Sequence, residues 1–281
     1  MDLELIRIFQ STMEVCRSNE GLIASIDASK QAQKVVFEEN AVSSAEPRFA
    51  GTVTQVLSSK RSFEAAKPYA RNRKKVCVLN FASFVTPGGG VTRGARAQEE
   101  SLCRISTLYP LLTSETAAPF YQRHHELIEA QISTRRNNDD CIYTPGVRVI
   151  CEDNAGCRLL PESEWYTVDV ITCAAPDQRY CGSWTYQPDN AELYEVMQRR
   201  IERIYAIAAM HSADVLVMGA FGCGAFHNPP EVVARAFETA SRRYAHHFTT
   251  IEYAIYNRYG SSPNYQAFAR IEGICIGNSE V

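Results

Sequence analysis

Two glycine-rich loops and a pair of adjacent acids are the features of this chain best suited to ligand binding or catalysis. The first loop, residues 80–90, ends in three successive glycines, and Glu99 and Glu100 follow it closely. Successive glycines permit positive φ angles and let a bulky ligand approach the backbone. Backbone amides placed between a buried strand and a helix can receive anionic or ribose ligands. The position of the triplet therefore favours a ligand-binding loop over a merely flexible turn.

The second loop, residues 219–228, leads into a well-specified helix start. Asn228 suits the N-cap, Pro229 the first helical position and Glu231 the acceptor of a capping box. A diphosphate over residues 222–226 would face free amides and the positive end of the helix dipole. The loop has no Gly-Lys-Ser/Thr of a Walker motif, and His227 replaces the third glycine of a dinucleotide fingerprint. Two such loops indicate a split site for diphosphate and ribose.

The paired acids lie at the start of a predicted helix, where acids often only complement the helix dipole. Glu99 and Glu100 follow the glycine triplet so closely that they must lie near its ligand. Adjacent helical residues point about 100° apart, so one acid can face the ligand and the other its flank. They cannot straddle a scissile bond as the carboxyls of common glycosidases do. The spacing favours one acid/base residue with a neighbour that binds a sugar hydroxyl.

The elements that must position these residues alternate between strands and helices. Strands are predicted at 35–37, 51–57, 75–81, 146–152, 166–174, 215–220 and 249–256. Helices are predicted at 3–16, 63–72, 95–109 (stopped by Pro110), 191–210, 229–244 and 265–271. This alternation predicts an α/β sheet covered on both faces, with ligands bound beyond the carboxyl ends of the strands.

The bulk properties narrow the class of protein further. The 281 residues are 45% apolar and 22% charged, which is ordinary globular composition. A single domain is expected over 1–281, with about 1–50 as an N-terminal accessory segment. The formal net charge of −3 argues against broad nucleic-acid binding, and no apolar run approaches a membrane span. The acidic N-terminus lacks the features of a secretory signal.

The cysteines and histidines indicate neither disulfides nor a metal site. Without an export signal, the ten cysteines are expected to be reduced thiols in a cytoplasmic protein, or a nuclear one if the source is eukaryotic. No C-x-x-C, H-x-x-x-H or H-E-x-x-H spacing occurs. We therefore predict no metal and no cofactor.

The motifs together resemble a known family. The order G-G-G, seven residues, Q-E-E and then G-C-G-A-F before a capped helix resembles the microbial-type poly(ADP-ribose) glycohydrolases, a catalytic branch of the macrodomain fold. The resemblance covers roughly residues 50–260 and includes segments 76–83, 94–102, 143–147 and 170–176. It implies a macrodomain-like mixed β-sheet flanked by helices on both faces, with an N-terminal helical extension.

The resemblance also implies roles for individual residues. Glu100 would be the catalytic acid/base, Glu99 would bind hydroxyls of the ribose being cleaved, and Phe226 would orient the distal ribose. Ser83 departs from the asparagine of many macrodomains. The expected substrate-binding residues are Asn80, Ser83, Gly88, Gly89, Gly90, Gln98, Gly222, Cys223, Gly224, Ala225 and Phe226. The candidates for stacking on adenine are Tyr256, Asn257 and Phe221.

The predicted reaction is metal-independent hydrolysis of the ribose–ribose O-glycosidic bond, which releases ADP-ribose. The expected partners are ADP-ribose polymer or an ADP-ribosylated protein, without membrane or direct nucleic-acid binding. Two alternatives stay open. The chain could be a macrodomain that binds ADP-ribose without cleaving it, although such a module would not need the Q-E-E run. It could also hydrolyse a mono-ADP-ribosyl conjugate, because the sequence does not define the leaving side of the site.

Overall fold

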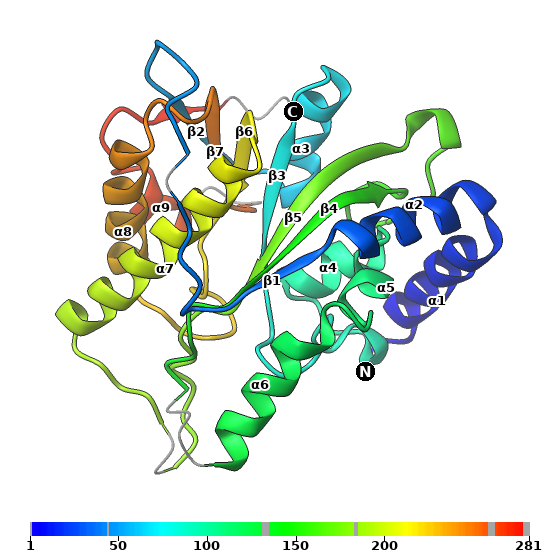
Figure 1. Cartoon of the computed structure of the whole chain (residues 1–281), viewed down its shortest axis with the longest axis horizontal. Helices are drawn as coiled ribbons and strands as arrows, with labels where there is room; N and C mark the ends of the chain where they lie inside the picture. The colour runs from blue at the N-terminus through cyan, green and yellow to red at the C-terminus, as the bar shows by residue number, and fades with distance from the viewer. Residues whose placement is uncertain (1, 44, 131–134, 183–184, 258–261, 278–281) are drawn as a thin grey trace.

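The computed structural model describes residues 2–43, 45–130, 135–182, 185–257 and 262–277, and it shows one sheet between two layers of helices (Figure 1). Within these ranges the strand order is β1-β4-β5-β3-β6-β7-β2-β8. The strands are β1 (Lys34–Val36), β2 (Thr54–Ser58), β3 (Val76–Phe81), β4 (Cys141–Val149), β5 (Tyr166–Cys173), β6 (Val215–Met218), β7 (Thr250–Ala254) and β8 (Cys275–Ile276).

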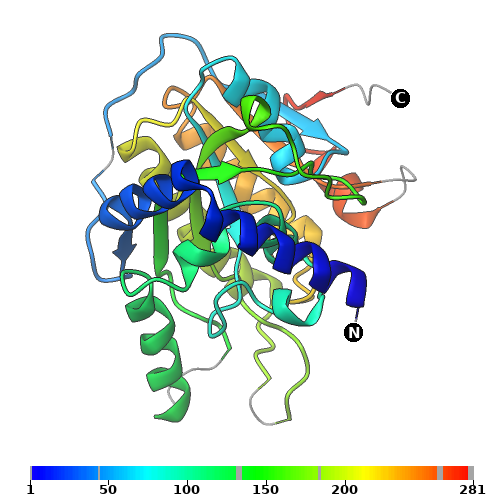
Figure 2. The ribbon, with the colours of Figure 1, turned by 90° about the vertical axis from the view of Figure 1, so that its right-hand side faces the viewer.

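The sheet is mixed, as expected. Strands β5, β3, β6, β7, β2 and β8 pair in parallel, and β4 and β1 add an antiparallel edge. Parallel neighbours place their carboxyl ends at one edge of a sheet, which is where ligands bind in open α/β folds. The loops after β3, β5, β6 and β7 therefore lie along one edge of the sheet, and the segment after β5 extends to the lower end of the molecule in Figure 2.

The helices are divided between the two faces of the sheet (Figure 1). One face is covered by α7 (Asn190–Met210), α8 (Pro230–Arg243) and α9 (Pro263–Phe268). The other is covered by α1 (Leu3–Ser18), α2 (Glu20–Ala32), α3 (Ser62–Arg71), α4 (Gln98–Arg104), α5 (Leu108–Leu112) and α6 (Ala118–Glu129). Two short 3₁₀ turns are Val91–Arg93 and Glu162–Glu164.

Strand β3 shows why helices must cover both faces of the sheet. Cys77 and Leu79 belong to the buried cluster under α7 and α8, whereas Val76 and Val78 belong to the cluster under α1 to α6. Successive side chains of a strand point to opposite faces, so an uninterrupted apolar run exposes apolar surface on both sides of the sheet. Burial of that surface by two helical layers drives the fold.

The helix expected at 95–109 is wrong in its extent, because α4 ends at Arg104 and α5 begins at Leu108. Ser106 separates the two helices. Its Oγ donates to the carbonyl of Leu102 at 2.7 Å and accepts from the Leu108 N–H at 3.1 Å. Pro110 does not stop a helix here. It lies in the first turn of α5, where the N–H that proline lacks would have had no helical partner.

Helices α2 and α6 were not predicted from the sequence. The buried residues of α6 are Phe120, Tyr121 and His124. A histidine thus takes one position of the buried face where the pattern of an amphipathic helix calls for an apolar residue. Residues Phe9 and Leu22 of α1 and α2 join the same buried cluster as β3. The separation of an accessory segment at about 1–50 stays a prediction.

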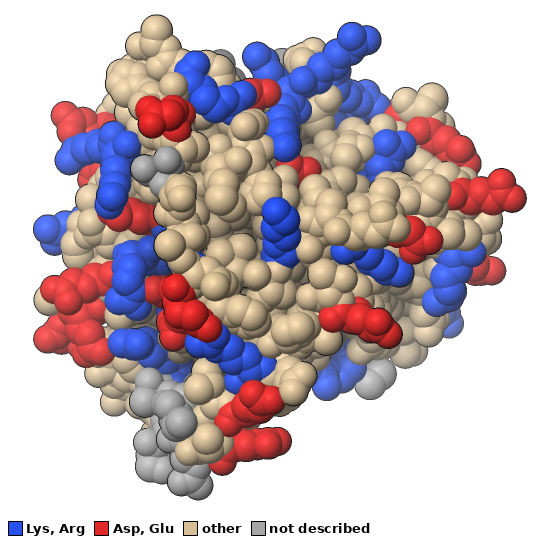
Figure 3. All heavy atoms as spheres, viewed as in Figure 1, with Lys and Arg blue, Asp and Glu red and all other residues tan. Residues whose placement is uncertain are grey.

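Charged side chains of both signs are mixed on the face shown in Figure 3, with uncharged residues between them. Mixed charges largely cancel at a distance, so this face creates no strong field of one sign. Among the described helices, none is both long enough and apolar enough to cross a lipid bilayer.

Candidate active site

Glu99 and Glu100 are buried in the first turn of α4, and the first loop binds both carboxylates. The N–H of Gly90 donates to Glu100 Oε1 at 2.8 Å. The N–H of Ser83 donates to Glu99 Oε2 at 2.7 Å, and Asn80 Nδ2 donates to Glu99 Oε1 at 3.2 Å. The acids are therefore held against the first loop and are not exposed at a solvated helix start.

The glycine triplet packs so closely on its surroundings that side chains are excluded. Gly89 has a φ of 57°, and a Cβ there would lie 2.4 Å from Glu100 Oε1. Gly88 has a φ of 67°, and its Cβ would lie 2.7 Å from the Tyr109 ring. Both conformations are unfavourable for residues with a side chain. A glycine at position 89 is thus required to leave room for Glu100, besides any contact with a ligand.

The two acids differ in their free hydrogen-bonding capacity. Both carboxylate oxygens of Glu99 already accept a hydrogen bond. In contrast, Oε2 of Glu100 is buried and has no hydrogen-bond partner among the described residues. A buried polar atom without a partner costs free energy that a bound ligand can recover. Glu100 is therefore the acid whose second oxygen has no hydrogen bond to give up when a substrate binds.

Burial raises the pKa of Glu99 to about 8, although hydrogen bonds from Ser83 and Asn80 lower it. The nearby charge of Glu100 raises the pKa of Glu99 further. At neutral pH Glu99 consequently keeps its proton in the absence of substrate, and a neutral carboxyl can both donate to and accept from a sugar hydroxyl.

This raised pKa predicts a pH-dependent stability. The folded protein keeps the Glu99 proton up to about pH 8, whereas an unfolded glutamate loses it near 4.5. The unfolded chain thus binds fewer protons in this window. Each pH unit then lowers the free energy of unfolding by up to about 1.4 kcal/mol through this group. In thermal unfolding scans, the Tm of Glu99→Gln minus that of wild type should increase from pH 5 to pH 8.

The control for this experiment is Glu115→Gln, which removes an exposed carboxylate. Its Tm should follow wild type across the whole range. If the difference between Glu99→Gln and wild type did not change with pH, the raised pKa of Glu99 would be wrong.

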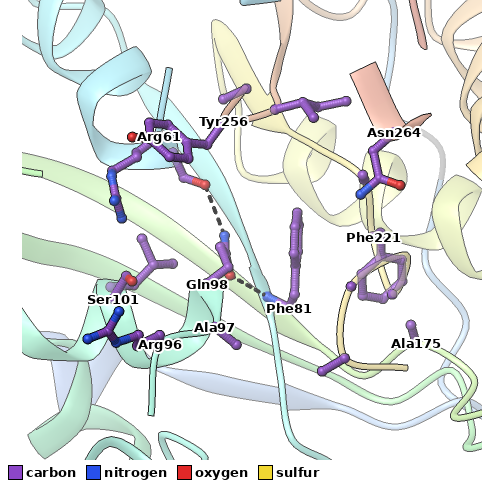
Figure 4. Close-up of a pocket in the computed structure, with 18 of the residues that line it drawn as sticks. Arg61, Phe81, Arg96, Ala97, Gln98, Ser101, Ala175, Phe221, Tyr256 and Asn264 are labelled. Carbon is purple, nitrogen blue, oxygen red and sulfur yellow. Dashed lines mark hydrogen bonds between the residues drawn. The ribbon is translucent and has the colours of Figure 1, made fainter. Parts of the chain in front are cut away.

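Gln98 lines the site, but its amide is already engaged (Figure 4). Oε1 accepts from the Phe81 N–H at 2.9 Å, and Nε2 donates to the Leu79 carbonyl at 2.7 Å and to Ser62 Oγ at 3.1 Å. These bonds fasten the start of α4 to the carboxyl end of β3. Asn80 is fully buried and bonded to Glu99. Both residues position the acids, and their predicted contact with substrate stays a prediction.

The second loop is closed by the side chain of Asn228. Its Nδ2 donates to the carbonyls of Gly222 at 3.0 Å and Pro176 at 2.8 Å, and its Oδ1 accepts from Gln178 Nε2 at 2.8 Å. The expectation that Asn228 caps the next helix is therefore wrong. Pro229 is the N-cap of α8, because the Asn228 amide is used inside the loop.

The glycines of the second loop serve different purposes. Gly222 has a φ of 74°, and a Cβ there would lie 2.4 Å from Asn228 Nδ2 and 2.5 Å from Ala175 Cβ. Gly224 has no atom within 4 Å of an added Cβ, so its backbone is open to a ligand. Burial raises the pKa of the Cys223 thiol, which is unfavourable for a nucleophile.

A cavity of about 400 Å³ lies between the start of α4, the second loop and the segment after β7. Of the expected substrate-binding residues, its wall includes Gln98, Gly222, Gly224, Ala225 and Phe226. The acids and the glycine triplet are not part of this wall. They lie on the other side of the first turn of α4, against the first loop.

Phe226 connects the cavity with the first loop, which holds the acids. It lines the cavity, and its ring centre lies 6.3 Å from that of Phe84 in the first loop. Phe221 of the second loop also lines the cavity, with its ring centre 5.7 Å from that of Phe81. The two glycine loops are therefore side by side, as their positions after parallel strands predicted.

Several lining residues were not predicted from the sequence. They include Asp153 and four residues labelled in Figure 4: Arg61, Arg96, Ser101 and Asn264. Asp153 accepts from the Phe63 N–H at 2.9 Å and so binds the start of α3. Burial raises its pKa to about 6. This contact joins residues 90 positions apart, so no local pattern could reveal it.

Tyr256 was a candidate for stacking on adenine, and it lines the cavity. The guanidinium carbon of Arg61 lies 4.5 Å from its ring centre, and the two side chains form one wall (Figure 4). Asn257 is not in the wall, and its Oδ1 accepts from the Ser262 N–H at 3.3 Å.

Comparison with known families agrees with this arrangement. The family model described as "Microbial-type PARG, catalytic domain" matches residues 6–152, which is more than half of the chain. The chain belongs to this family. No curated protein sequence gives a significant match.

Solved structures of the family share the fold. Poly(ADP-ribose) glycohydrolase from Thermomonospora curvata has a TM-score of 0.80 and 28% identity, over 96% of this chain and 99% of that chain. Its complex with the inhibitor ADP-HPD gives 0.79 and 27% over the same shares. A mutant of the Deinococcus radiodurans enzyme in complex with ADP-ribose gives 0.74 and 30%, over 87% and 96%. The predicted family, the macrodomain-like fold and the glycoside hydrolase class are confirmed.

Proposed function

We propose that this protein hydrolyses the ribose–ribose O-glycosidic bond of poly(ADP-ribose) and releases ADP-ribose, with Glu100 as the acid/base. The observation that carries this proposal is the Glu100 carboxylate. Oε1 is fixed by the Gly90 N–H, while the buried Oε2 has no partner among the described residues. A fixed acid with one free oxygen is what proton transfer to a leaving group requires.

The chemistry needs only one proton carrier. Glu100 starts in its protonated form and donates the proton to the bridging glycosidic oxygen. The bond between that oxygen and the anomeric carbon breaks, so the oxygen leaves as a hydroxyl and the anomeric carbon takes on oxocarbenium character. The resulting carboxylate then removes a proton from water, whose oxygen bonds to the anomeric carbon, and Glu100 regains its proton. Glu99, fixed by Ser83 and Asn80, binds hydroxyls of the ribose.

The shape of the site supports a substrate that spans both loops. The cavity of about 400 Å³ is within the range of small-molecule sites and accepts the adenosine end, beside Tyr256 and Arg61. The open backbone at Gly224 receives the diphosphate. The distal ribose then lies between Phe226 and the acids.

Gly224→Val tests the diphosphate site. Free ADP-ribose should raise the Tm of wild type, because a ligand that binds only the folded state stabilises it. The valine should remove most of this shift by blocking backbone approach. Since nothing lies within 4 Å of a Cβ at Gly224, the Tm without ligand should change little. An undiminished ligand shift in this variant would place the diphosphate elsewhere.

We also propose that the reaction needs no metal, since the acid/base scheme uses carboxyl groups alone. Activity on poly(ADP-ribose) should survive excess EDTA within about twofold. Loss of activity on chelation that is restored by zinc or magnesium would contradict this scheme. Ten free cysteines support action in a reducing compartment, and we propose the cytoplasm, with ADP-ribosylated proteins as partners.

A further inference from the structure

Next to the second loop, a buried aspartate binds two arginines. Asp177 is fully buried and accepts from Arg135 Nη1 at 2.7 Å, and from Arg179 Nε at 2.8 Å and Nη2 at 2.7 Å. The arginine side chains remain 27% and 47% exposed. Two guanidinium groups on one carboxylate leave a positive charge at the surface, with the planar geometry that suits phosphate.

Arg179 connects this cluster to the active site. Its guanidinium carbon lies 5.0 Å from the ring centre of Phe226, and the N–H of Gln178 donates to the Phe226 carbonyl at 3.0 Å. The ring centre of Phe226 also lies 6.3 Å from that of Phe84 in the first loop. Residues 176–180 thus border the place where the two loops meet. The segment after β5 extends to the lower end of the molecule (Figure 2).

The next residue, Tyr180, has the most exposed large hydrophobic side chain of the described residues, at 85%. We call Phe226, Arg179 and Tyr180 the row: Arg179 lies over the Phe226 ring, and Tyr180 follows Arg179 in the chain with its side chain in solvent. Exposed aromatic rings beside arginine are suited to nucleotides, because bases stack on the ring and guanidinium groups bind phosphate oxygens.

The structure of the proposed substrate indicates which group lies beside this row. In poly(ADP-ribose), the hydroxyl that leaves the distal ribose belongs to the adenosine of the next unit, which continues into a diphosphate. The cavity beside Tyr256 is filled by the unit being released, so the remaining polymer must leave past the acids and Phe226.

We propose that Tyr180, Arg179 and Arg135 form a subsite for the next nucleotide of the polymer, on the leaving-group side of the scissile bond. Tyr180 stacks on its adenine, and the two arginines bind its diphosphate. This inference rests on the proposed glycohydrolase function. The subsite favours polymer over free ADP-ribose, because the monomer cannot reach both the cavity and the row.

The test compares a two-unit ADP-ribose oligomer with monomeric ADP-ribose, both binding to Glu100→Gln so that the oligomer stays intact. Titration calorimetry should give an oligomer Kd about tenfold or more below that of the monomer, with steeper salt dependence. Adding Tyr180→Ala or Arg179→Gln should reduce the ratio of the two Kd values to about twofold or less. The monomer Kd should stay nearly constant in Tyr180→Ala, whose side chain is exposed and unnecessary for folding.

Arg242→Gln is the matched control, because it removes an exposed arginine of α8 that pairs with Glu238 and Glu272. It should leave the oligomer preference intact. Equal Kd values for monomer and oligomer, together with polymer hydrolysis by wild type, would overturn the subsite and leave the proposed function standing. A preference that Tyr180→Ala and Arg179→Gln do not reduce would also overturn it. Absence of polymer hydrolysis by wild type would instead reject the proposed function.

Discussion

Replacing Glu100 by glutamine is expected to reduce hydrolysis of poly(ADP-ribose) by about 10²–10⁴-fold, the usual cost of a lost general acid/base. Glutamine has the shape of glutamate, and its carbonyl oxygen can still accept from the Gly90 N–H. It cannot exchange a proton at the second position. Affinity for ADP-ribose should change little, because Glu100 acts on the leaving oxygen. Product release from defined poly- and mono-ADP-ribosylated substrates, identified by mass, measures the effect.

Two comparisons make the result specific. Glu99→Gln should also impair turnover, with part of the loss in substrate binding, because Glu99 is proposed to bind the ribose hydroxyls while Ser83 and Asn80 hold it in place. The exposed-site variant Glu115→Gln should keep full activity. A fully active Glu100→Gln would disprove the assigned role. If wild type and Glu100→Gln bound ADP-ribose equally and neither cleaved any polymer or conjugate, the chain would be an ADP-ribose-binding module.

Gly89→Ala should produce the second large loss. A methyl group there would lie 2.4 Å from Glu100 Oε1, and the φ of 57° is unfavourable for alanine by roughly 1–2 kcal/mol. The carboxylate must therefore move. Displacement of a catalytic group by about 1 Å can cost about 10²-fold in rate, so we expect a decrease of that order in kcat/KM.

Gly51→Ala is the matched control for this substitution, since no atom lies within 4 Å of its added Cβ and its φ is not in the left-handed region. It should have wild-type kinetics. Near-normal kcat/KM in Gly89→Ala, at an unchanged Tm, would mean that the triplet does not set the position of Glu100.

The parts of the fold with strong local patterns were predictable from the sequence. The uninterrupted apolar run of β3 indicated a strand buried on both faces, and the structure covers it on both sides. The glycine triplet and the paired acids were close enough in sequence to imply contact. Their bonds, such as Gly90 to Glu100, span ten residues or so. Short spacing and chain connectivity are enough to predict such contacts.

The remaining features depend on contacts between distant segments. Asp153 reaches the start of α3 across 90 residues, and Asn228 bonds to Pro176 across 52. The roles of such side chains depend on contacts in the packed structure and not on a local sequence pattern. Asn228 illustrates this directly: its type and position suited a helix cap, yet tertiary contacts used its amide to close the loop instead.

Closure of the second loop by Asn228 has a consequence for turnover. Ordering a loop costs roughly 1–2 kcal/mol per residue in conformational entropy, and here much of that cost is met during folding through Gly222, Pro176 and Gln178. A ligand that meets an ordered loop keeps more of its contact energy as affinity. ADP-ribose, as product, benefits as much as the polymer does. With the diphosphate bound at this loop, as proposed, an ordered loop retains the product as well as the substrate, and we therefore expect ADP-ribose to inhibit the reaction.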